Sequence, residues 1–422
     1  MRRALLAALL AAVAGCSRSA PPSSGQYLFV WAGDSAGKSS DFLAVMDANP
    51  SSSTYGSILT SIPTGTAGAH PHHTEAEMPV DGHLLANGFN AGRTWLFDLK
   101  QPLQPTIITS FGERGGFSHP HTYLRLADGH VLATFQYKAD SNARTPAHTM
   151  GGSPMVATAN RIENTTGGLV ELDERGTIVR SASAADTTIT DRYIYPYSVV
   201  TIPTIDRAVS TTTDMDQADK KSTAQWVQFW RLSDLSLIKS IALKPGPRGD
   251  ENQFSGEPRL LADGNGVYIH TFNCGLYLIR GIENTEPTAS FVKGFPGKDC
   301  GVPVLAGHFW LQPVPSTHSL MSLDITDPEH PREVASVSVG DDEEPHWIAI
   351  DPTGRRIVLN SGGYAKGNRL FVINFDPTTG ALAIDDRFRD AGSTRAGVNL
   401  SGRKWPHGFV GTASPHGTVF SR

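Results

Sequence analysis

The chain has few cysteines, few charged residues and no long hydrophobic run beyond its N-terminus. Three cysteines in 422 residues exclude a small domain held together by disulfides. Charged residues make up 18% of the sequence and the formal net charge is −5. Lysine and arginine form no cluster, so we expect no nucleic-acid partner. No segment after the first residues is long and apolar enough for a transmembrane helix.

The first residues have the features of a bacterial export signal. Arg2 and Arg3 precede an apolar run over residues 4–13, which is too short to span a bilayer and is typical of a signal peptide. The run ends in Val13-Ala14-Gly15-Cys16, which resembles the lipobox of bacterial lipoproteins. We therefore expect cleavage before Cys16 and lipidation of its thiol. The alternative is an ordinary secreted protein in which this cysteine occurs by chance.

This interpretation divides the chain into three parts. Residues 1–15 are a signal peptide, residues 16–25 are the lipidated cysteine and a flexible spacer rich in Ser and Pro, and residues 26–422 are a single domain. We expect an exported protein that faces the periplasm or the cell surface. Its N-terminal lipid, in the inner or outer membrane, would be its only membrane contact.

Two cysteines remain, Cys274 and Cys300. In an oxidising compartment two such thiols usually pair, so a disulfide is the expected arrangement. Paired thiolate ligands for a soft metal are the alternative.

Glycine and proline are abundant, with 42 and 28 residues, or about one residue in six. Such a turn-rich composition favours an all-β protein. A unit of short β-rich runs recurs, with a turn such as Asp-Gly after its first run and an aspartate near the end of a later one. Six units start near His72, His121, Tyr195, Glu257, Val302 and His346.

The two ends of the chain supply a seventh unit. Residues 407–420 provide one or two strands, and residues 27–31, 42–47 and 58–61 provide more. Propellers commonly close their ring in this way, and strands that repeat at several tens of residues fit this architecture. We predict an all-β, seven-bladed β-propeller closed by pairing of its N- and C-terminal strands. Six or eight blades, a pair of β-sandwiches and a β-helix are the alternatives.

Four Pro-His pairs each precede a hydrophobic run, with a glycine eight or ten residues after the histidine: Pro71-His72, Pro120-His121, Pro345-His346 and Pro406-His407. Proline stiffens the chain at these points. The pairs belong to units that become neighbours once the ring closes. We therefore expect each histidine at the start of the innermost strand of its blade, facing the central axis. Imidazole is the commonest transition-metal ligand, so we predict a metal site made by His72, His73, His121, His346 and His407, with the choice between His72 and His73 left open.

The other histidines lack this position. His70 and His119 precede the prolines and are expected to support the ligands or to be exposed, and His270 lies in a β-rich run and is expected to be buried. The rest are expected at the surface or in turns: His83, His130, His148, His308, His318, His330 and His416. The acidic run at residues 341–344 is expected to be a solvated loop, or else to orient His346.

An all-imidazole site suits copper, zinc, iron or nickel. Copper would allow redox chemistry, whereas zinc held by three histidines and a water molecule would support hydrolysis. The spacing of the histidines alone does not separate these metals.

Several local strings resemble the selenium-binding protein family, whose bacterial members include periplasmic methanethiol oxidases. The strings are Phe42-Leu43-Ala44-Val45-Met46-Asp47 with Pro50, His72-His73, His121-Thr122 before Leu126-Ala127-Asp128-Gly129, Asp324-Ile325-Thr326-Asp327-Pro328, and Pro406-His407. They are spread over most of the chain. Three positions depart from the family pattern: residues 74–80 replace a cysteine-containing stretch, Leu124 replaces a histidine, and His346 stands where the family does not usually have a histidine.

The resemblance implies a seven-bladed propeller that holds a copper ion through His72 and/or His73, His121 and His407. It also implies oxidation of methanethiol by oxygen to formaldehyde, hydrogen sulfide and hydrogen peroxide. We therefore expect a lipid-anchored, copper-dependent oxidoreductase acting on a small sulfur compound such as a thiol. The alternatives are a non-catalytic surface propeller that binds a partner or metal, and a zinc-dependent hydrolase.

Overall fold

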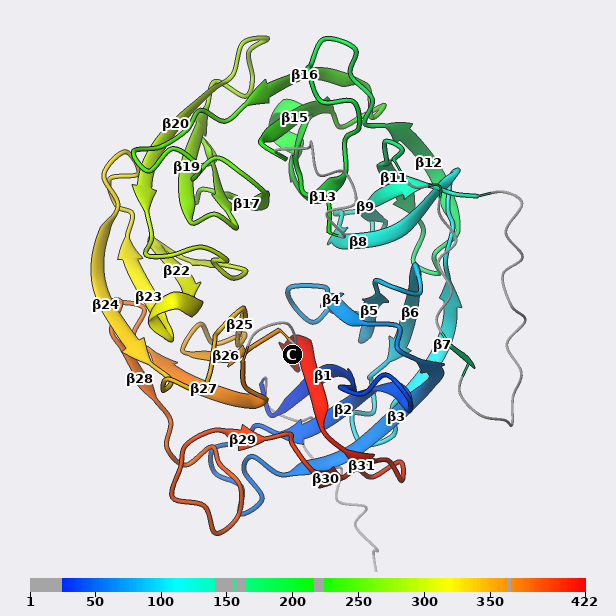
Figure 1. Cartoon of the computed structure of the whole chain (residues 1–422), viewed down its shortest axis with the longest axis vertical. Coiled ribbons are helices and arrows are strands. Elements are labelled where there is room, and N and C mark those ends of the chain that lie inside the picture. The colour runs from blue at the N-terminus through cyan, green and yellow to red at the C-terminus, as the bar shows by residue number, and fades with distance from the viewer. Residues whose placement is uncertain (1–24, 141–154, 157–161, 163, 216–223, 363–365) are drawn as a thin grey trace, which may run out of the picture.

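The protein is an all-β, seven-bladed propeller, as the repeat predicts (Figure 1). The structure, a computed structural model, describes residues 25–140, 155–156, 162, 164–215, 224–362 and 366–422. The helical elements of this part are two short 3₁₀ turns, η1 (Pro203–Ile205) and η2 (Pro315–Thr317). The predicted signal peptide (residues 1–15) lies outside the described residues, as do residues 16–24 of the predicted lipidated cysteine and spacer. His148 also lies outside them.

Each blade is an antiparallel sheet of four main strands, innermost strand first. Blade 1 comprises β4 (Pro71–Thr74), β5 (His83–Gly88), β6 (Arg93–Asp98) and β7 (Thr106–Phe111). Blade 2 comprises β8 (Phe117–Arg125), β9 (Val131–Lys138), β11 (Gly168–Leu172) and β12 (Ile178–Ser183). Blade 3 comprises β13 (Pro196–Ile202), β14 (Arg207–Thr212), β15 (Trp226–Arg231) and β16 (Leu237–Ala242). Blade 4 comprises β17 (Ser255–Leu260), β18 (Val267–Thr271), β19 (Gly275–Arg280) and β20 (Thr288–Gly294). Blade 5 comprises β21 (Val304–Ala306), β22 (Phe309–Val314), β23 (Ser319–Asp324) and β24 (Arg332–Ser338).

Blades 6 and 7 carry additional short strands. Blade 6 contains β25 (Trp347–Ile350), β26 (Arg356–Asn360), β27 (Arg369–Phe375) and β28 (Leu382–Ile384), with β29 (Val398–Asn399) beside β27. Blade 7 contains β32 (Ala413–Phe420), β1 (Tyr27–Asp34), β2 (Ser40–Asp47) and β3 (Ile58–Ala67), with β10 (Met155–Val156) beside β3. A separate hairpin is formed by β30 (Arg403–Lys404) and β31 (Val410–Gly411).

Blade 7 closes the ring by joining the two ends of the chain, as predicted. The C-terminal β32 is its innermost strand and pairs antiparallel with β1, with Leu28 opposite Phe420 and Asp34 opposite Ala413. In Figure 1 the red C-terminal strand lies beside the blue N-terminal strands. With the ring closed, the remaining sheet edges are the short outermost strands of the blades.

The hydrophobic core lies between neighbouring blades. Strands in the middle of a blade are buried on both faces, as in β26, whereas the outermost β12 and β24 alternate between partly buried and exposed residues. One cluster joins Phe309 and Leu311 of blade 5 to Ile357 of blade 6. The propeller is thus held by face-to-face packing of twisted sheets.

Cys274 and Cys300 form a disulfide with Cα atoms 5.1 Å apart. They lie in the loops before β19 and before β21, within the hydrophobic cluster between blades 4 and 5. Within the described residues, no helix has the length and apolar character needed to cross a membrane.

Candidate metal centre

The innermost strands share one hydrogen-bonding position near their start. In four blades a backbone N–H at this position donates to a side chain of the second strand: His73 to Asn87, Thr122 to Thr134, Ser198 to Thr211 and Glu257 to His270. We call the preceding residue the inner-strand slot. His72, His121, Tyr197 and Gly256 occupy it in blades 1 to 4. His346 and His416 follow Pro345 and Pro415 at the corresponding points of blades 6 and 7.

The structure brings His72, His73 and His121 together. One nitrogen from each ring lies within 4.8 Å of the other two, and all three residues are buried. The rings of His72 and His73 stack with centroids 4.4 Å apart, and both lie within 5 Å of the His121 ring. Nitrogens bound to one ion at about 2.0–2.1 Å lie roughly 4 Å or less from one another. Small side-chain rotations would therefore bring all three onto one ion.

His121 is oriented for metal binding. Its Nδ1 lies 2.8 Å from the backbone carbonyl oxygen of Tyr197, so Nδ1 carries the hydrogen and Nε2 keeps the lone pair. This Nε2 is buried and has no hydrogen-bond partner among the described residues. A buried polar atom without a partner is costly, and a metal ion would supply one. A ligating histidine typically donates its second nitrogen to such a carbonyl.

His73 is surrounded by polar groups of three other blades. Its Nε2 lies 3.3 Å from the Tyr197 hydroxyl, and its Nδ1 lies 3.4 Å from Thr122 Oγ1 and 3.8 Å from Glu257 Oε1. The second carboxylate oxygen of Glu257 accepts hydrogen bonds from Ser198 and Arg259. The carboxylate is therefore held in place and can orient the His73 ring.

Burial keeps these imidazoles neutral. Removal from water lowers the pKa of His121 to about 3 and lowers the pKa values of His72, His73 and His416 well below the ordinary histidine value. The neighbouring imidazoles lower the pKa values of His72 and His73 further. Metal binding requires neutral imidazole, so these residues are ready to act as ligands at neutral pH.

His346 and His416 extend the cluster through blades 6 and 7. The His416 ring lies 4.2 Å from that of His72 and 5.2 Å from that of His346. His416 is buried, while His346 is partly exposed and its pKa is lowered by burial to about 4. Five imidazoles from four adjacent blades thus gather near the axis.

The prediction that His407 belongs to this group was wrong. His407 lies in the turn of the β30–β31 hairpin, where its Nδ1 is 2.7 Å from Ser61 Oγ and its ring packs on Phe42. These contacts lie on the outer strands of blade 7, whereas the innermost strand is β32. His416 takes the place expected for His407, and the assignment of His416 to the surface was wrong.

The sequence contained a signal for His416. Pro415-His416 is a fifth Pro-His pair and directly precedes the last hydrophobic run. It was missed because the eight-to-ten-residue spacing to glycine selected His407, with Gly417 as its turn. Gly417 is in fact a strand residue, and a Cβ there would lie 2.5 Å from the backbone nitrogen of Thr74. Tyr197 and Glu257 had no sequence signal beyond their position in the repeat.

The other candidates have structural surroundings. His119 and His270 are buried, His70 stacks edge-on against His72 with ring centroids 5.8 Å apart, and His270 accepts the Glu257 N–H. Within the acidic run, Asp342 pairs with Arg395, and Glu343 lies 3.7 Å from Arg369, so neither points at His346.

A second group of possible ligands lies at the turn between β8 and β9. His130 Nδ1 is 2.8 Å from Glu171 Oε1 and 3.4 Å from Asp128 Oδ2. Arg180 also pairs with Glu171. An arginine in this position already neutralises the carboxylate, so the group is a poorer cation site than the buried imidazoles.

Residues 33–37, Gly-Asp-Ser-Ala-Gly, match the letters of a hydrolase nucleophile elbow. They form the β1–β2 hairpin turn, where Asp34 accepts backbone N–H groups from Ala36, Lys38 and Ser39. Ser35 lies 2.7 Å from the Ser414 hydroxyl. Since the elbow requires a strand-to-helix turn, this segment is a structural hairpin.

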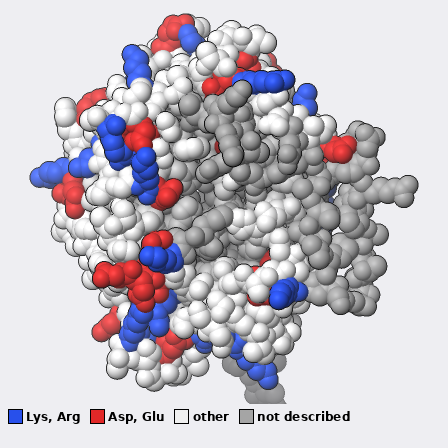
Figure 2. All heavy atoms as spheres, in the orientation of Figure 1, with Lys and Arg blue, Asp and Glu red and all other residues white. Residues whose placement is uncertain are grey.

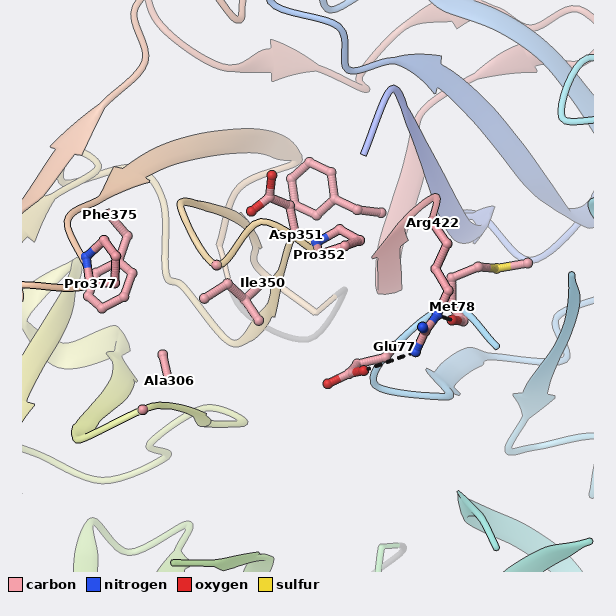
Figure 3. A pocket seen from close by; sticks show the side chains of 12 residues that line it. Glu77, Met78, Ala306, Ile350, Asp351, Pro352, Phe375, Pro377 and Arg422 are labelled. Atoms are coloured by element: carbon pink, nitrogen blue, oxygen red, sulfur yellow. Dashed lines mark hydrogen bonds and ion pairs between the residues drawn. The ribbon is translucent and has the colours of Figure 1, made fainter. Parts of the chain in front are cut away.

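A cavity of about 640 Å³ opens directly onto the imidazole cluster and is lined by His72, His346 and Tyr197 among others. A smaller cavity of about 360 Å³ lies beyond the opposite ends of β4, β21, β25 and β32 (Figure 3). Its walls include the Glu77–Arg422 ion pair, and no histidine is among the described residues that line it. Among the described residues on the face drawn in Figure 2, acidic and basic side chains are interspersed and neither sign forms a continuous patch.

No established protein-family profile matches the chain. It is 23% identical over 357 residues to methanethiol oxidase of Hyphomicrobium sp, covering 82% of this chain and 77% of that protein. It is 27% identical over 119 residues to selenium-binding protein 1 of Arabidopsis thaliana, covering 25% of this chain and 24% of that protein. The chain is a divergent homologue of these proteins.

Solved structures agree on the fold. A hypothetical selenium-binding protein from Sulfolobus tokodaii superposes with a TM-score of 0.69 at 18% identity, covering 95% of this chain and 94% of that one. A periplasmic gluconolactonase of Pseudomonas aeruginosa gives a TM-score of 0.58 at 16% identity, covering 94% and 99%. At these identities the likeness concerns the propeller architecture alone.

Proposed function

We propose that the protein is a copper-dependent oxidoreductase that oxidises a small thiol. The observation that carries this proposal is the buried cluster of neutral imidazoles at His72, His73 and His121, of which His72 also lines a cavity. The homology to methanethiol oxidase supports a thiol as the substrate.

The residues fit a copper ion. Imidazole suits copper, and the donor set contains no carboxylate that would favour calcium or magnesium. His121 supplies a lone pair that has no other partner among the described residues. The Tyr197 carbonyl holds the His121 ring, and Glu257 Oε1 lies 3.8 Å from His73 Nδ1. His416 is close enough to His72 to serve as a further ligand. Bound copper would supply one-electron redox chemistry at the thiol sulfur.

The reaction balances with oxygen and water as co-reactants. A primary thiol RCH₂SH, O₂ and H₂O would give the aldehyde RCHO, H₂S and H₂O₂, so the carbon loses two electrons and oxygen gains them. In this scheme His72 and His346 face the substrate from the cavity wall. The Tyr197 hydroxyl, 3.3 Å from His73 Nε2, would hold an exchangeable proton next to the site. The buried position of the other imidazoles keeps bulk water away from them.

The deciding experiment is reconstitution of protein purified without a histidine tag. We expect about one tightly held copper per chain, and release of H₂S and H₂O₂ from methanethiol by the copper-loaded protein only. Retention of zinc with turnover of esters or lactones would instead support a hydrolase. Absence of any stoichiometric metal would support a binding propeller without catalysis.

We also propose that the protein is exported and tethered by a lipid on Cys16. The basis is the N-terminal sequence alone, with its short apolar run and lipobox-like end. Metabolic labelling with a radioactive fatty acid should mark the wild-type protein and not a Cys16→Ser variant. Labelling of both proteins would contradict the assignment.

A further inference from the structure

The cavity above the imidazole cluster is much larger than methanethiol requires. Its volume is about 640 Å³, whereas one water molecule occupies about 30 Å³ in the liquid. Pockets for drug-sized molecules span about 300–1,000 Å³. A substrate with one carbon and one sulfur would leave most of this space to water. The volume therefore leaves room for a larger organic molecule.

Aromatic side chains form the wall next to the cluster. The Phe272 ring lies nearly parallel to that of His346, with centroids 6.1 Å apart and an interplanar angle of 9°. Tyr197 meets Phe272 edge-on at 5.3 Å, and its ring lies 4.1 Å from that of His121. Phe254 also lines the cavity. Aromatic walls bind aromatic groups by stacked or edge-on contacts.

Phe254 adopts a backbone conformation that bulky residues rarely take. Its φ is +59°, and its carbonyl accepts the N–H of Phe272. In blade 1 the corresponding residue, His70, has φ +60° and its carbonyl accepts the N–H of Phe89. The repeat thus imposes this conformation, in which glycine would be unstrained. A phenylalanine kept there at a conformational cost points to a use for its ring.

Ion pairs neutralise the lysines of the cavity. Lys298 Nζ lies 2.5 Å from Asp250 Oδ2, and Lys366 Nζ lies 3.8 Å from Glu344 Oε1. Asp214 and Asp299 add negative charge to the lining. Among the residues that the structure describes, the lining offers no uncompensated cation to bind a carboxylate, and it favours a neutral ligand over an anionic thiol.

We infer that this cavity binds a neutral primary thiol that carries an aromatic group, for example 2-phenylethanethiol. The ring would lie against Phe272 and Tyr197, with the sulfur toward His72 and His346. The inference rests on the proposed oxidase function for its thiol part. In that reaction 2-phenylethanethiol, O₂ and H₂O give phenylacetaldehyde, H₂S and H₂O₂.

The aromatic site can be tested without any redox chemistry. We expect calorimetry to detect binding of 2-phenylethanol to the wild-type protein. The affinity of Phe272→Leu should be lower by about 2- to 10-fold, because this variant loses one aromatic contact. Phe291→Leu is the matched control, because Phe291 lies on β20 of the same blade and does not line the cavity. No binding to the wild type, or equal binding to both variants, would overturn the inference.

A second variant separates binding from stability. Phe254→Gly should weaken 2-phenylethanol binding while the melting temperature stays equal or rises, because glycine accepts the positive φ without strain. If Phe254 serves packing alone, the melting temperature will fall and binding will not change, which would count against the inference.

Turnover by the copper-loaded protein distinguishes this inference from the proposed function. We expect a higher kcat/KM for 2-phenylethanethiol than for methanethiol, measured as H₂S release, and a selective fall for the larger thiol in Phe272→Leu. Turnover of methanethiol alone would overturn the inference and leave the function standing. Turnover of neither thiol, with 2-phenylethanol still bound, would reject the oxidase function and with it the thiol assignment, leaving an aromatic binding site.

Discussion

At the scale of single residues, the site depends on which nitrogen of each imidazole is already engaged. His121 donates Nδ1–H to the Tyr197 carbonyl and therefore presents Nε2 to the cluster. The Nδ1 of His407 instead lies 2.7 Å from Ser61 Oγ, and the His407 ring packs on Phe42, away from the innermost strands. Two histidines that follow prolines in the same way thus have different roles, and the pair provides a matched comparison.

His121→Ala should lower copper affinity by at least tenfold, because it removes a ligand whose geometry is preset. His407→Ala should leave copper affinity unchanged, since its ring is not part of the cluster. Competition titrations against a chromophoric chelator would measure both. Equal losses in the two variants would show that the cluster is not the metal site.

The sequence predicted most of the site residues but not their complete set. Pro-His pairs identify His72, His121 and His346 because each strand start repeats the same local geometry. The exchange of His407 for His416 could not be predicted from spacing, because an extra hairpin intervenes before the last strand. The roles of Tyr197 and Glu257 arise from contacts between blades distant in sequence, which no local pattern records.

At the scale of elements, side chains of one blade hold the strands of the next. Asn87 donates to the carbonyl of Pro120, Gln136 to that of Pro196, and Asn360 to that of His416. Asp41 of blade 7 likewise accepts the N–H of Ala69, just before blade 1. These buried bonds position the inner strands, and so the histidines on them.

Asp41 should make stability depend on pH. Burial raises its pKa to about 7, against about 3.9 in an unfolded chain, and the nearby Asp34 also raises it. The folded state therefore holds a proton that the unfolded chain releases, so this stabilisation is complete below pH 4 and is lost as the pH rises through 7. Between pH 4 and pH 8 the free energy of unfolding of the wild type should fall by on the order of 2–4 kcal/mol more than that of Asp41→Asn. Urea unfolding at several pH values would check this, and parallel curves for the two proteins would contradict it.

The Cys274–Cys300 disulfide joins residues 26 positions apart and closes a loop that contains β19 and β20. Replacing both cysteines with serine should lower the free energy of unfolding by about 2–4 kcal/mol. Copper content should not change, since the bond lies in the core between blades 4 and 5. Reduction of the wild type should reproduce the effect in denaturant unfolding, and an unchanged midpoint would argue against a stabilising role.

At the scale of the whole molecule, one strand both closes the ring and completes the cluster. β32 contributes the innermost strand of blade 7 and carries His416. The blade count and this closure were predictable, because strand runs and turns repeat along the chain and the two ends supply complementary parts of one blade. The large cavity was not predictable, since it is lined by loops of several blades.

Truncation after Thr412 should abolish cooperative unfolding, because β1 would lose its partner and the cores on both sides of blade 7 would open. Removal of Arg422 alone is the control and should cost little, since Arg422 lies beyond β32 and its ion pair with Glu77 is exposed. Thermal melts by circular dichroism would compare the two. A cooperative transition in the longer truncation would show that six blades suffice.

The central claim is that His72, His73 and His121 hold one copper ion beside the cavity that His72 lines. Anomalous diffraction at the copper absorption edge, from crystals of copper-loaded protein, tests it most directly. We predict one strong peak within bonding distance of nitrogens from these three residues and none beside His407. A peak only at Asp128, His130 and Glu171, or no peak in protein shown to be folded, would contradict the account.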